Sequence, residues 1–151
     1  MINDPEFLTR KNQWLRIFLE LGIPCSTEFY PNPEGAERIL VLCRGGNTRS
    51  VAVAMLLKYK YFKNALTASL EKNDAGTIRM LYDWCSYVIL TEDSHRAEFF
   101  KLVPEATQEA CNPTVMLDLG THRRLVTHPY DLELLKEIDV KLQEMFKNGK
   151  P

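Results

Sequence analysis

Short apolar runs alternate with longer amphipathic segments along most of the chain. The clearest run covers residues 39–42, where four apolar side chains, two of them β-branched, follow one another without polar alternation. This composition is typical of a strand buried on both faces of a parallel sheet. Residues 87–90 and 114–117 have a similar composition, and residues 65–70 are predicted as a further short strand.

Helical patterns fill the intervals between the predicted strands. Asp4 and Pro5 form a typical helix start, apolar side chains then recur on one side of the segment, and Gly22 ends it. The following stretch contains several prolines, which predicts an irregular connection. Further helices are predicted over residues 50–61, 74–84, 94–102 and 131–147, the first of them capped by Ser50.

This order of elements predicts an α/β fold. Strands that alternate with helices form a doubly wound parallel sheet, here of about four strands with helices on both faces and an extra N-terminal helix. The length of 151 residues indicates a single domain, 1–151. It would consist of an N-terminal helix and connection over residues 1–36 and an α/β core over residues 37–151. Ligands of such sheets bind beyond the carboxyl ends of the strands.

The segment after the first predicted strand has a pattern that suits an anion. This segment, called the Cys43 loop below, comprises Cys43, Arg44, Gly45, Gly46, Asn47, Thr48 and Arg49. Two glycines and an asparagine let a backbone bend tightly with its N–H groups turned inward. The helix start that follows adds unpaired N–H donors and the positive end of the helix dipole. Together these features predict a cradle for a phosphate-like anion.

The ends of the Cys43 loop add a nucleophile and an anion clamp. A thiol reacts as the thiolate, and its pKa falls at a helix N-terminus beside cationic groups, which is the position expected for Cys43. Arg49 can present two donors in one plane to two phosphate oxygens. The Ser50 hydroxyl can hydrogen-bond the sulfur. These groups meet the needs of phosphoryl transfer, which are an in-line nucleophile and donors to the equatorial oxygens.

The spacing Cys43-x5-Arg49-Ser50 after an apolar strand resembles the signature loop of the cysteine-dependent protein tyrosine phosphatases. Its place after the first strand of the sheet narrows the resemblance to the low-molecular-weight family. A further segment also resembles that family: a tryptophan, here Trp84, shortly precedes an apolar strand. The resemblance covers roughly residues 37–146, and within it the Cys43 loop is the most specific part.

The resemblance implies a phosphatase that acts on phosphotyrosine-type monoesters through a phosphocysteine intermediate. Cys43 would be the nucleophile, and residues 44–48 with Ser50 would bind the substrate, either a phosphorylated protein or a small phosphoester. The sequence departs from the family at Gly46, where asparagine is usual, and at Val51, where proline often stands. Fine substrate recognition is therefore left open.

The proton donor to the leaving group is a second open point. The low-molecular-weight family supplies it from an Asp-Pro pair shortly before the last helix. Here His128 precedes Pro129 at that place, and Asp131 follows three residues later, where it is also a good helix cap. Asp118, at the end of the last predicted strand, is a third candidate. A carboxylic acid matches the family's chemistry, so Asp131 is placed slightly ahead of His128.

Two other functions fit the same fold. A non-catalytic module would bind phosphate or a phosphoprotein with the cradle and lack the proton donor. An arsenate reductase would need further cysteines near Cys43 as an electron relay, and Cys85 and Cys111 are poorly placed for this by sequence.

Composition limits the partners and the compartment. The net charge of -1 and the pI near 6.3 predict no attraction to nucleic acid or to an anionic membrane. No apolar run approaches the length of about 18 residues that indicates a membrane span, so a cytoplasmic protein with reduced cysteines is expected. The histidines and cysteines lack metal-ligand spacing; neither a metal nor a cofactor is expected, and His95, among charged neighbours, is expected at the surface. Nothing in the sequence indicates the oligomeric state.

Overall fold

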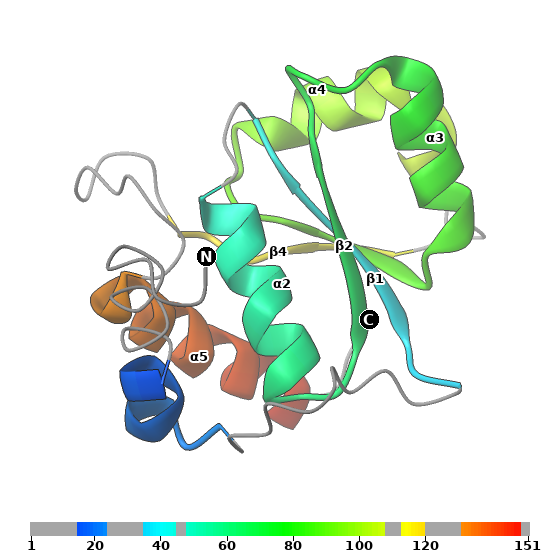
Figure 1. The fold of residues 1–151 in the computed structure, drawn as a ribbon. Coiled ribbons are helices and arrows are strands. Elements are labelled where there is room, and N and C mark those ends of the chain that lie inside the picture. The colour runs from blue at the N-terminus through cyan, green and yellow to red at the C-terminus, as the bar shows by residue number, and fades with distance from the viewer. Residues whose placement is uncertain (1–14, 24–34, 45–47, 108–112, 120–130, 149–151) are drawn as a thin grey trace, which may run out of the picture.

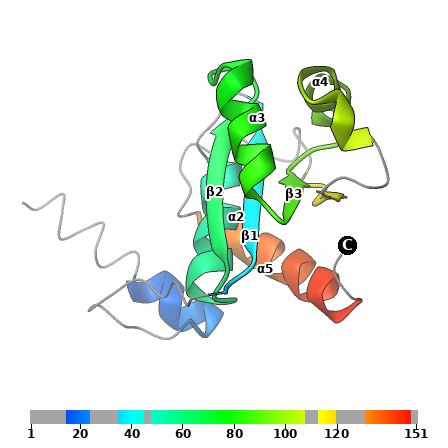
Figure 2. The ribbon, with the colours of Figure 1, turned by 90° about the vertical axis from the view of Figure 1, so that its right-hand side faces the viewer.

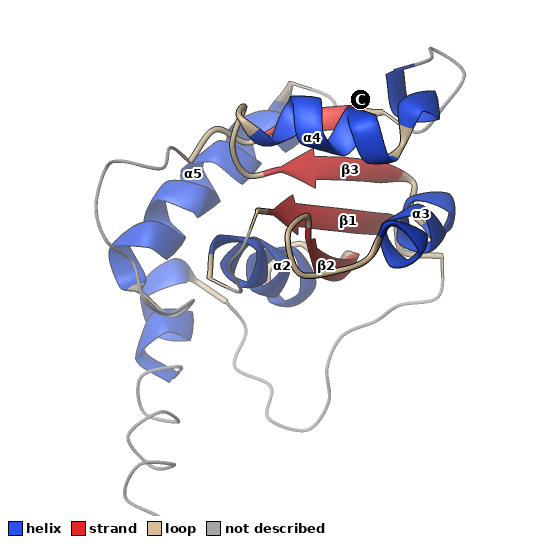
Figure 3. Ribbon diagram, turned by 90° about the horizontal axis from the view of Figure 1, so that it is seen from above, coloured by secondary structure: helices blue, strands red, loops and turns tan. Residues whose placement is uncertain are grey.

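A four-stranded parallel sheet forms the centre of the molecule (Figure 1). The computed structural model describes residues 15–23, 35–44, 48–107, 113–119 and 131–148. The strands are β1 (Arg38–Cys43), β2 (Asn64–Ser69), β3 (Tyr87–Leu90) and β4 (Thr114–Met116), in the order β2-β1-β3-β4. Each neighbouring pair is parallel, and Figure 3 shows β1 between β2 and β3. The predicted sheet of about four parallel strands is confirmed.

Helices cover both faces of this sheet. Helices α2 (Arg49–Tyr59) and α5 (Leu132–Lys147) pack on one face, and α3 (Ala75–Trp84) and α4 (His95–Leu102) pack on the other. A short 3-10 helix, η1 (Pro104–Thr107), follows α4. The doubly wound arrangement is thus confirmed. None of the helices in the described part of the chain is long and apolar enough to cross a bilayer.

Strand β1 is apolar throughout because both of its faces are covered. Ile39 and Val41 belong to the core beneath α2 and α5, whereas Leu40 and Leu42 belong to the core beneath α3 and α4. All four side chains are fully buried. Burial of one such side chain stabilises a fold by roughly 1.5–3 kcal/mol, so this strand anchors both layers and fixes the position of the residue that follows it.

Two of the helices begin at acidic caps. The carboxylates of Asp74 and Asp131 accept hydrogen bonds from the backbone N–H groups three residues further on, at 3.1 and 2.9 Å. Such caps satisfy donors that a helix start leaves unpaired. The prediction that Ser50 caps helix α2 is wrong. This helix begins at Arg49, its N-cap is Thr48, and the Ser50 side chain is buried.

The N-terminal helix belongs to the core layer of α2 and α5. Residues 15–21 are helical, and Gly22, with φ of +68°, ends the helix in a conformation that glycine adopts easily. Figure 2 shows this helix beside the end of α2. Its side of the core is filled by three buried side chains, Ile17, Leu21 and Ile23. The predicted start at Asp4 and Pro5 lies outside the described residues.

A partly buried polar cluster joins this helix to the rest of the layer. The Lys60 ammonium donates to the Leu21 carbonyl at 2.8 Å and to the Asp139 carboxylate at 2.6 Å. The Tyr61 hydroxyl donates to the other oxygen of Asp139 at 2.5 Å. Burial and the Asp139 carboxylate raise the pKa of Tyr61 well above its usual range. The opposite charges of Lys60 and Asp139 therefore compensate each other although both side chains are largely buried.

Candidate functional site

Cys43 ends the central strand at the place where doubly wound sheets bind their ligands. After β1 the chain continues into α2 on one face, and after β3 it continues into α4 on the other. Neighbouring parallel strands whose connections leave toward opposite faces create a binding crevice beyond their carboxyl ends. Strands β1 and β3 lie side by side (Figure 3), and Leu42 and Leu90 are paired in register at these ends. The segments that follow Leu42 and Leu90 therefore form the two sides of the site.

The Cys43 thiol lies against a serine hydroxyl. Its Sγ atom is 3.1 Å from Oγ of Ser50, and both side chains are buried. Ser50 stands in the first turn of α2, directly after Arg49. A hydroxyl at this distance can donate a hydrogen bond to a thiolate and stabilise its charge. The contact that the sequence suggested between Cys43 and Ser50 is present.

The first turn of α2 is suited to an anion. Its N-cap, Thr48, makes no side-chain cap hydrogen bond, and its first turn contains no acidic residue. The N–H groups and the positive dipole end of α2 thus have no carboxylate of this turn to compensate them. Arg49, the first residue of α2, is partly buried. Residues 45–47 of the Cys43 loop lie outside the described residues.

Polar groups at the ends of two strands hold the entrance to the Cys43 loop. The Ser69 hydroxyl, at the end of β2, donates to the Arg44 carbonyl at 2.6 Å. On the opposite side, the Thr91 hydroxyl donates to the Leu42 carbonyl at 3.2 Å. Sequence reasoning missed both residues. The available signal was a hydroxyl side chain at the carboxyl end of a strand that is otherwise apolar.

Arg44 links the Cys43 loop to the opposite side of the site. Its guanidinium lies 3.8 Å from the Glu98 carboxylate of α4, and 67% of its side chain is exposed. An exposed ion pair of this length contributes little stability. The contact nevertheless shows that α4 faces the residue directly after Cys43.

The prediction that His95 is a surface residue is wrong. Its relative exposure is 4%, although it is the first residue of α4. Its Nε2 lies 3.4 Å from the Glu92 carboxylate, and Nδ1 is buried with no hydrogen-bond partner in the described part of the chain. Burial lowers the pKa of His95, while the carboxylates of Glu92 and Glu98 oppose this. Because its neighbours in the sequence are charged, the burial of this ring could not be predicted from the sequence.

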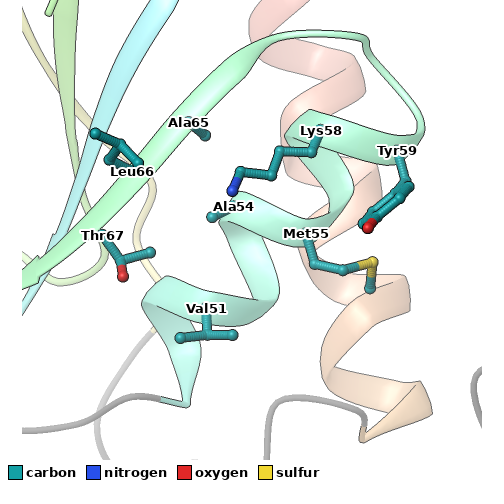
Figure 4. Close-up of a pocket in the computed structure, with 8 residues that line it drawn as sticks. All are labelled: Val51, Ala54, Met55, Lys58, Tyr59, Ala65, Leu66 and Thr67. Atoms are coloured by element: carbon teal, nitrogen blue, oxygen red, sulfur yellow. The ribbon is translucent and has the colours of Figure 1, made fainter. Parts of the chain in front are cut away.

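A groove outside the Cys43 region lies between α2 and β2 (Figure 4). It has a volume of about 440 Å³ and is lined by Val51, Ala54, Met55, Lys58, Tyr59, Ala65, Leu66 and Thr67. These lining residues include neither a carboxylate nor a thiol. Among the residues that the structure describes, no three side chains suited to a metal come together.

Comparison with known proteins identifies the fold. No protein-family model and no curated protein matches the sequence. A solved structure of Vibrio vulnificus Wzb in complex with benzylphosphonate matches 76% of this chain and 99% of its own, with 18% identity and a TM-score of 0.53. The fold is that of the low-molecular-weight protein tyrosine phosphatases. The YwlE arginine phosphatase from Geobacillus stearothermophilus matches the same shares at 18% identity, with a TM-score of 0.48.

Within this phosphatase fold, the candidate proton donors have different positions. Asp131 is the N-cap of α5 and accepts the hydrogen bond described above, so its role as a helix cap is confirmed. Asp118 is exposed and lies shortly after β4, at the same edge of the sheet as Cys43. Its backbone carbonyl accepts a hydrogen bond from Lys141. His128 lies outside the described residues. The choice of proton donor stays a prediction.

The second cysteine of the described core lies at the other edge of the phosphatase fold. Cys85 directly follows α3, before β3 begins, and is therefore at the amino end of the strands. Its sulfur donates to the Tyr82 carbonyl at 3.2 Å. Cys43 ends a parallel strand and so stands at the carboxyl end. This separation argues against an electron relay between Cys43 and Cys85.

Proposed function

We propose that the chain is a cysteine-dependent phosphatase, a divergent member of the low-molecular-weight family, that hydrolyses phosphotyrosine-type monoesters. The observation that carries the proposal is the contact of 3.1 Å between the Cys43 sulfur and the Ser50 hydroxyl at the start of α2. A thiol held there can be stabilised as a thiolate by a hydroxyl and by a helix dipole. The hydroxyl and the helix dipole would stabilise the thiolate both before it attacks phosphorus and when it leaves the phosphocysteine.

In the proposed reaction, the Cys43 thiolate attacks phosphorus in line with the leaving oxygen. The S–P bond forms while the ester P–O bond breaks, and the leaving oxygen receives a proton from an acid. Water then attacks the phosphocysteine, gives one proton to the conjugate base of that acid, and breaks the P–S bond. Cys43 leaves as a thiolate, to which Ser50 donates. Arg49 and the backbone N–H groups of residues 44–48 hold the equatorial oxygens.

The fold and the comparison support a substrate of this class. Wzb was solved in complex with benzylphosphonate, a phosphonate that carries an aromatic ring. For this chain we propose an aryl phosphate, presented by a phosphorylated protein or by a small phosphoester. The cytoplasm, where a thiolate stays reduced, is the proposed compartment.

A phosphate-binding module without turnover is the second candidate. The observation that favours it is the hydrogen bond of the Asp131 carboxylate to the first turn of α5. If Asp131 serves only as this helix cap, the chain has no carboxylic acid at that place to protonate a leaving oxygen. Such a module would keep Cys43 and Arg49 for binding.

Turnover of p-nitrophenyl phosphate by the purified full-length chain separates the two candidates. A phosphatase releases nitrophenolate, and a binding module shows only competition between the substrate analogue and inorganic phosphate. Incubation with excess substrate at mildly acidic pH, followed by rapid acid quench, should also trap phosphate on Cys43. Saturable binding without release of nitrophenolate would remove the phosphatase proposal.

The proton donor can be tested with leaving groups of different basicity. We expect Asp131→Asn to slow hydrolysis of an alkyl phosphate by about 10²-fold or more, as for loss of a general acid, and to change nitrophenyl phosphate turnover much less. Asparagine is a good N-cap, so α5 should stay folded. The matched control is Asp74→Asn, which makes the same change at the cap of α3.

Asp118→Asn and His128→Ala complete this series of variants. If either of them, and not Asp131→Asn, loses turnover of the alkyl phosphate, the preference for Asp131 is wrong. A pH–rate profile separates the two alternatives. Protonated histidine as the acid requires a pH below a pKa near ~6.5, so His128→Ala would remove that limb of the profile.

A further inference from the structure

His95 stands on the side of the site that faces Cys43. It is the first residue of α4 and follows β3 by a short connection, so it lies just beyond the carboxyl end of the strand paired with β1. Thr91, in that connection, is bonded to Leu42 through both its N–H and its hydroxyl, each at 3.2 Å. The connection that carries His95 is thus held directly beside the start of the Cys43 loop.

Charged groups surround this buried ring on two sides. Glu92, from the same connection, lies 3.4 Å from Nε2, and Glu98 stands one helical turn further along α4. From the other side of the site, Arg44 reaches the Glu98 carboxylate at 3.8 Å. Burial lowers the pKa of His95 most; the carboxylates of Glu92 and Glu98 raise it, and the smaller effects of the Arg44 and Arg49 charges lower it.

The Nδ1 atom of His95 is buried and has no hydrogen-bond partner among the residues that the structure describes. Such a condition is rare and costly for a buried polar atom. Burial, together with the smaller effect of the two arginine charges, makes a proton on this ring unfavourable. An oxyanion in the Cys43 loop would offset the arginine charges and would favour the same proton.

We propose that His95 takes up a proton when an oxyanion binds in the Cys43 loop, so that protonation of this ring and binding of the anion strengthen each other. The inference rests on the proposed function, because it requires the Cys43 loop to bind oxyanions. His95 is then a positioning residue: its imidazolium holds Glu92 and Glu98 on one side and attracts the anion on the other. Coupling of two binding events is reciprocal.

The sign of the pH dependence follows from this coupling. In the free protein the pKa of His95 lies below its ordinary value of 6.5, and the bound anion raises it. Affinity for the anion should be constant above the bound-state pKa, should increase as the pH falls to the free-state pKa, and should be constant again below it. Coupling of an ordinary size gives an affinity gain of about tenfold over this range.

Calorimetry with sulfate tests the inference. Sulfate keeps the same charge over about pH 5 to 8, the range in which histidine titrates, and the Cys43→Ser background removes the titration of the thiol. Titrations in buffers of different ionisation heat count the protons taken up on binding. We expect net uptake of up to one proton in Cys43→Ser, and its loss in Cys43→Ser with His95→Gln, which binds sulfate with little dependence on pH.

Two further measurements make the result independent of the glutamine variant's fold. Imidazole NMR of the Cys43→Ser protein should show that saturating sulfate raises the pKa of one of the three histidines, assigned as His95. Glu92→Gln should lower the pKa of His95, whereas Asp93→Asn, an exposed carboxylate paired with Arg96 instead, should not. Sulfate binding with an unchanged His95 pKa overturns this inference alone. Absence of sulfate binding at every pH overturns the proposed function as well.

Discussion

Replacing Cys43 with serine should abolish turnover of p-nitrophenyl phosphate while binding of inorganic phosphate survives. A serine hydroxyl ionises far less readily than a cysteine thiol, and it cannot form the phosphocysteine. Loss of an enzyme nucleophile costs about 10⁴-fold or more in kcat. The serine side chain still fits beside Ser50, which lies 3.1 Å from the present sulfur, so the anion cradle should remain.

The control for this substitution is Cys85→Ser. Cys85 is also buried and donates to the carbonyl of Tyr82, a bond that a hydroxyl can keep. It lies at the amino end of the sheet, away from Cys43, so kcat should stay close to the parent value. Steady-state kinetics and phosphate titrations on both variants provide the comparison. A Cys43→Ser protein with the parent rate would refute the mechanism.

Arg49→Lys should reduce kcat for the same substrate by about 10²-fold or more, as for loss of one transition-state donor. Lysine keeps the charge but offers a single donor point, so it cannot contact two phosphate oxygens in one plane. Affinity for phosphate should weaken at the same time. Because Arg49 is only partly buried and opens α2, its replacement should leave the core intact.

Arg79→Lys serves as the matched control for this charge-preserving change. Arg79 lies on α3 and pairs with Glu105, on the far side of the sheet from α2. Its substitution should leave both kcat and phosphate affinity within about twofold of the parent. If Arg49→Lys behaves in the same way as Arg79→Lys, Arg49 has no contact with the transferred phosphoryl group.

The strands and most helix boundaries were predictable because local sequence and tertiary packing agree on them. β1 and β3 are covered on both faces, so their apolar runs could be recognised without knowledge of neighbours. Asp74 and Asp131 precede their helices in the sequence as they do in space. At these positions the local sequence pattern agrees with the packing of the folded chain, and the fold class could therefore be predicted.

The errors arose where tertiary contacts decide the role of a polar residue. Serine is a common N-cap residue, but the Ser50 hydroxyl lies against the Cys43 sulfur, and Thr48 is the N-cap of α2. His95 has charged neighbours in the sequence, but its side chain is buried in the folded protein. The sequence indicated the contact between Ser50 and the sulfur seven residues earlier, but not that Thr48 takes the cap position; the burial of His95 has no signature among its charged sequence neighbours.

The contact between Lys60 and the carbonyl of Leu21 has a consequence for local unfolding. The same ammonium serves the end of the N-terminal helix and Asp139 of α5, so separation of that helix would leave the ammonium with one acceptor fewer. Segments that share polar partners and a core open together as cooperative units. Amide hydrogens of residues 17–21 should therefore exchange on the timescale of α2 and α5, not on that of a frayed terminus.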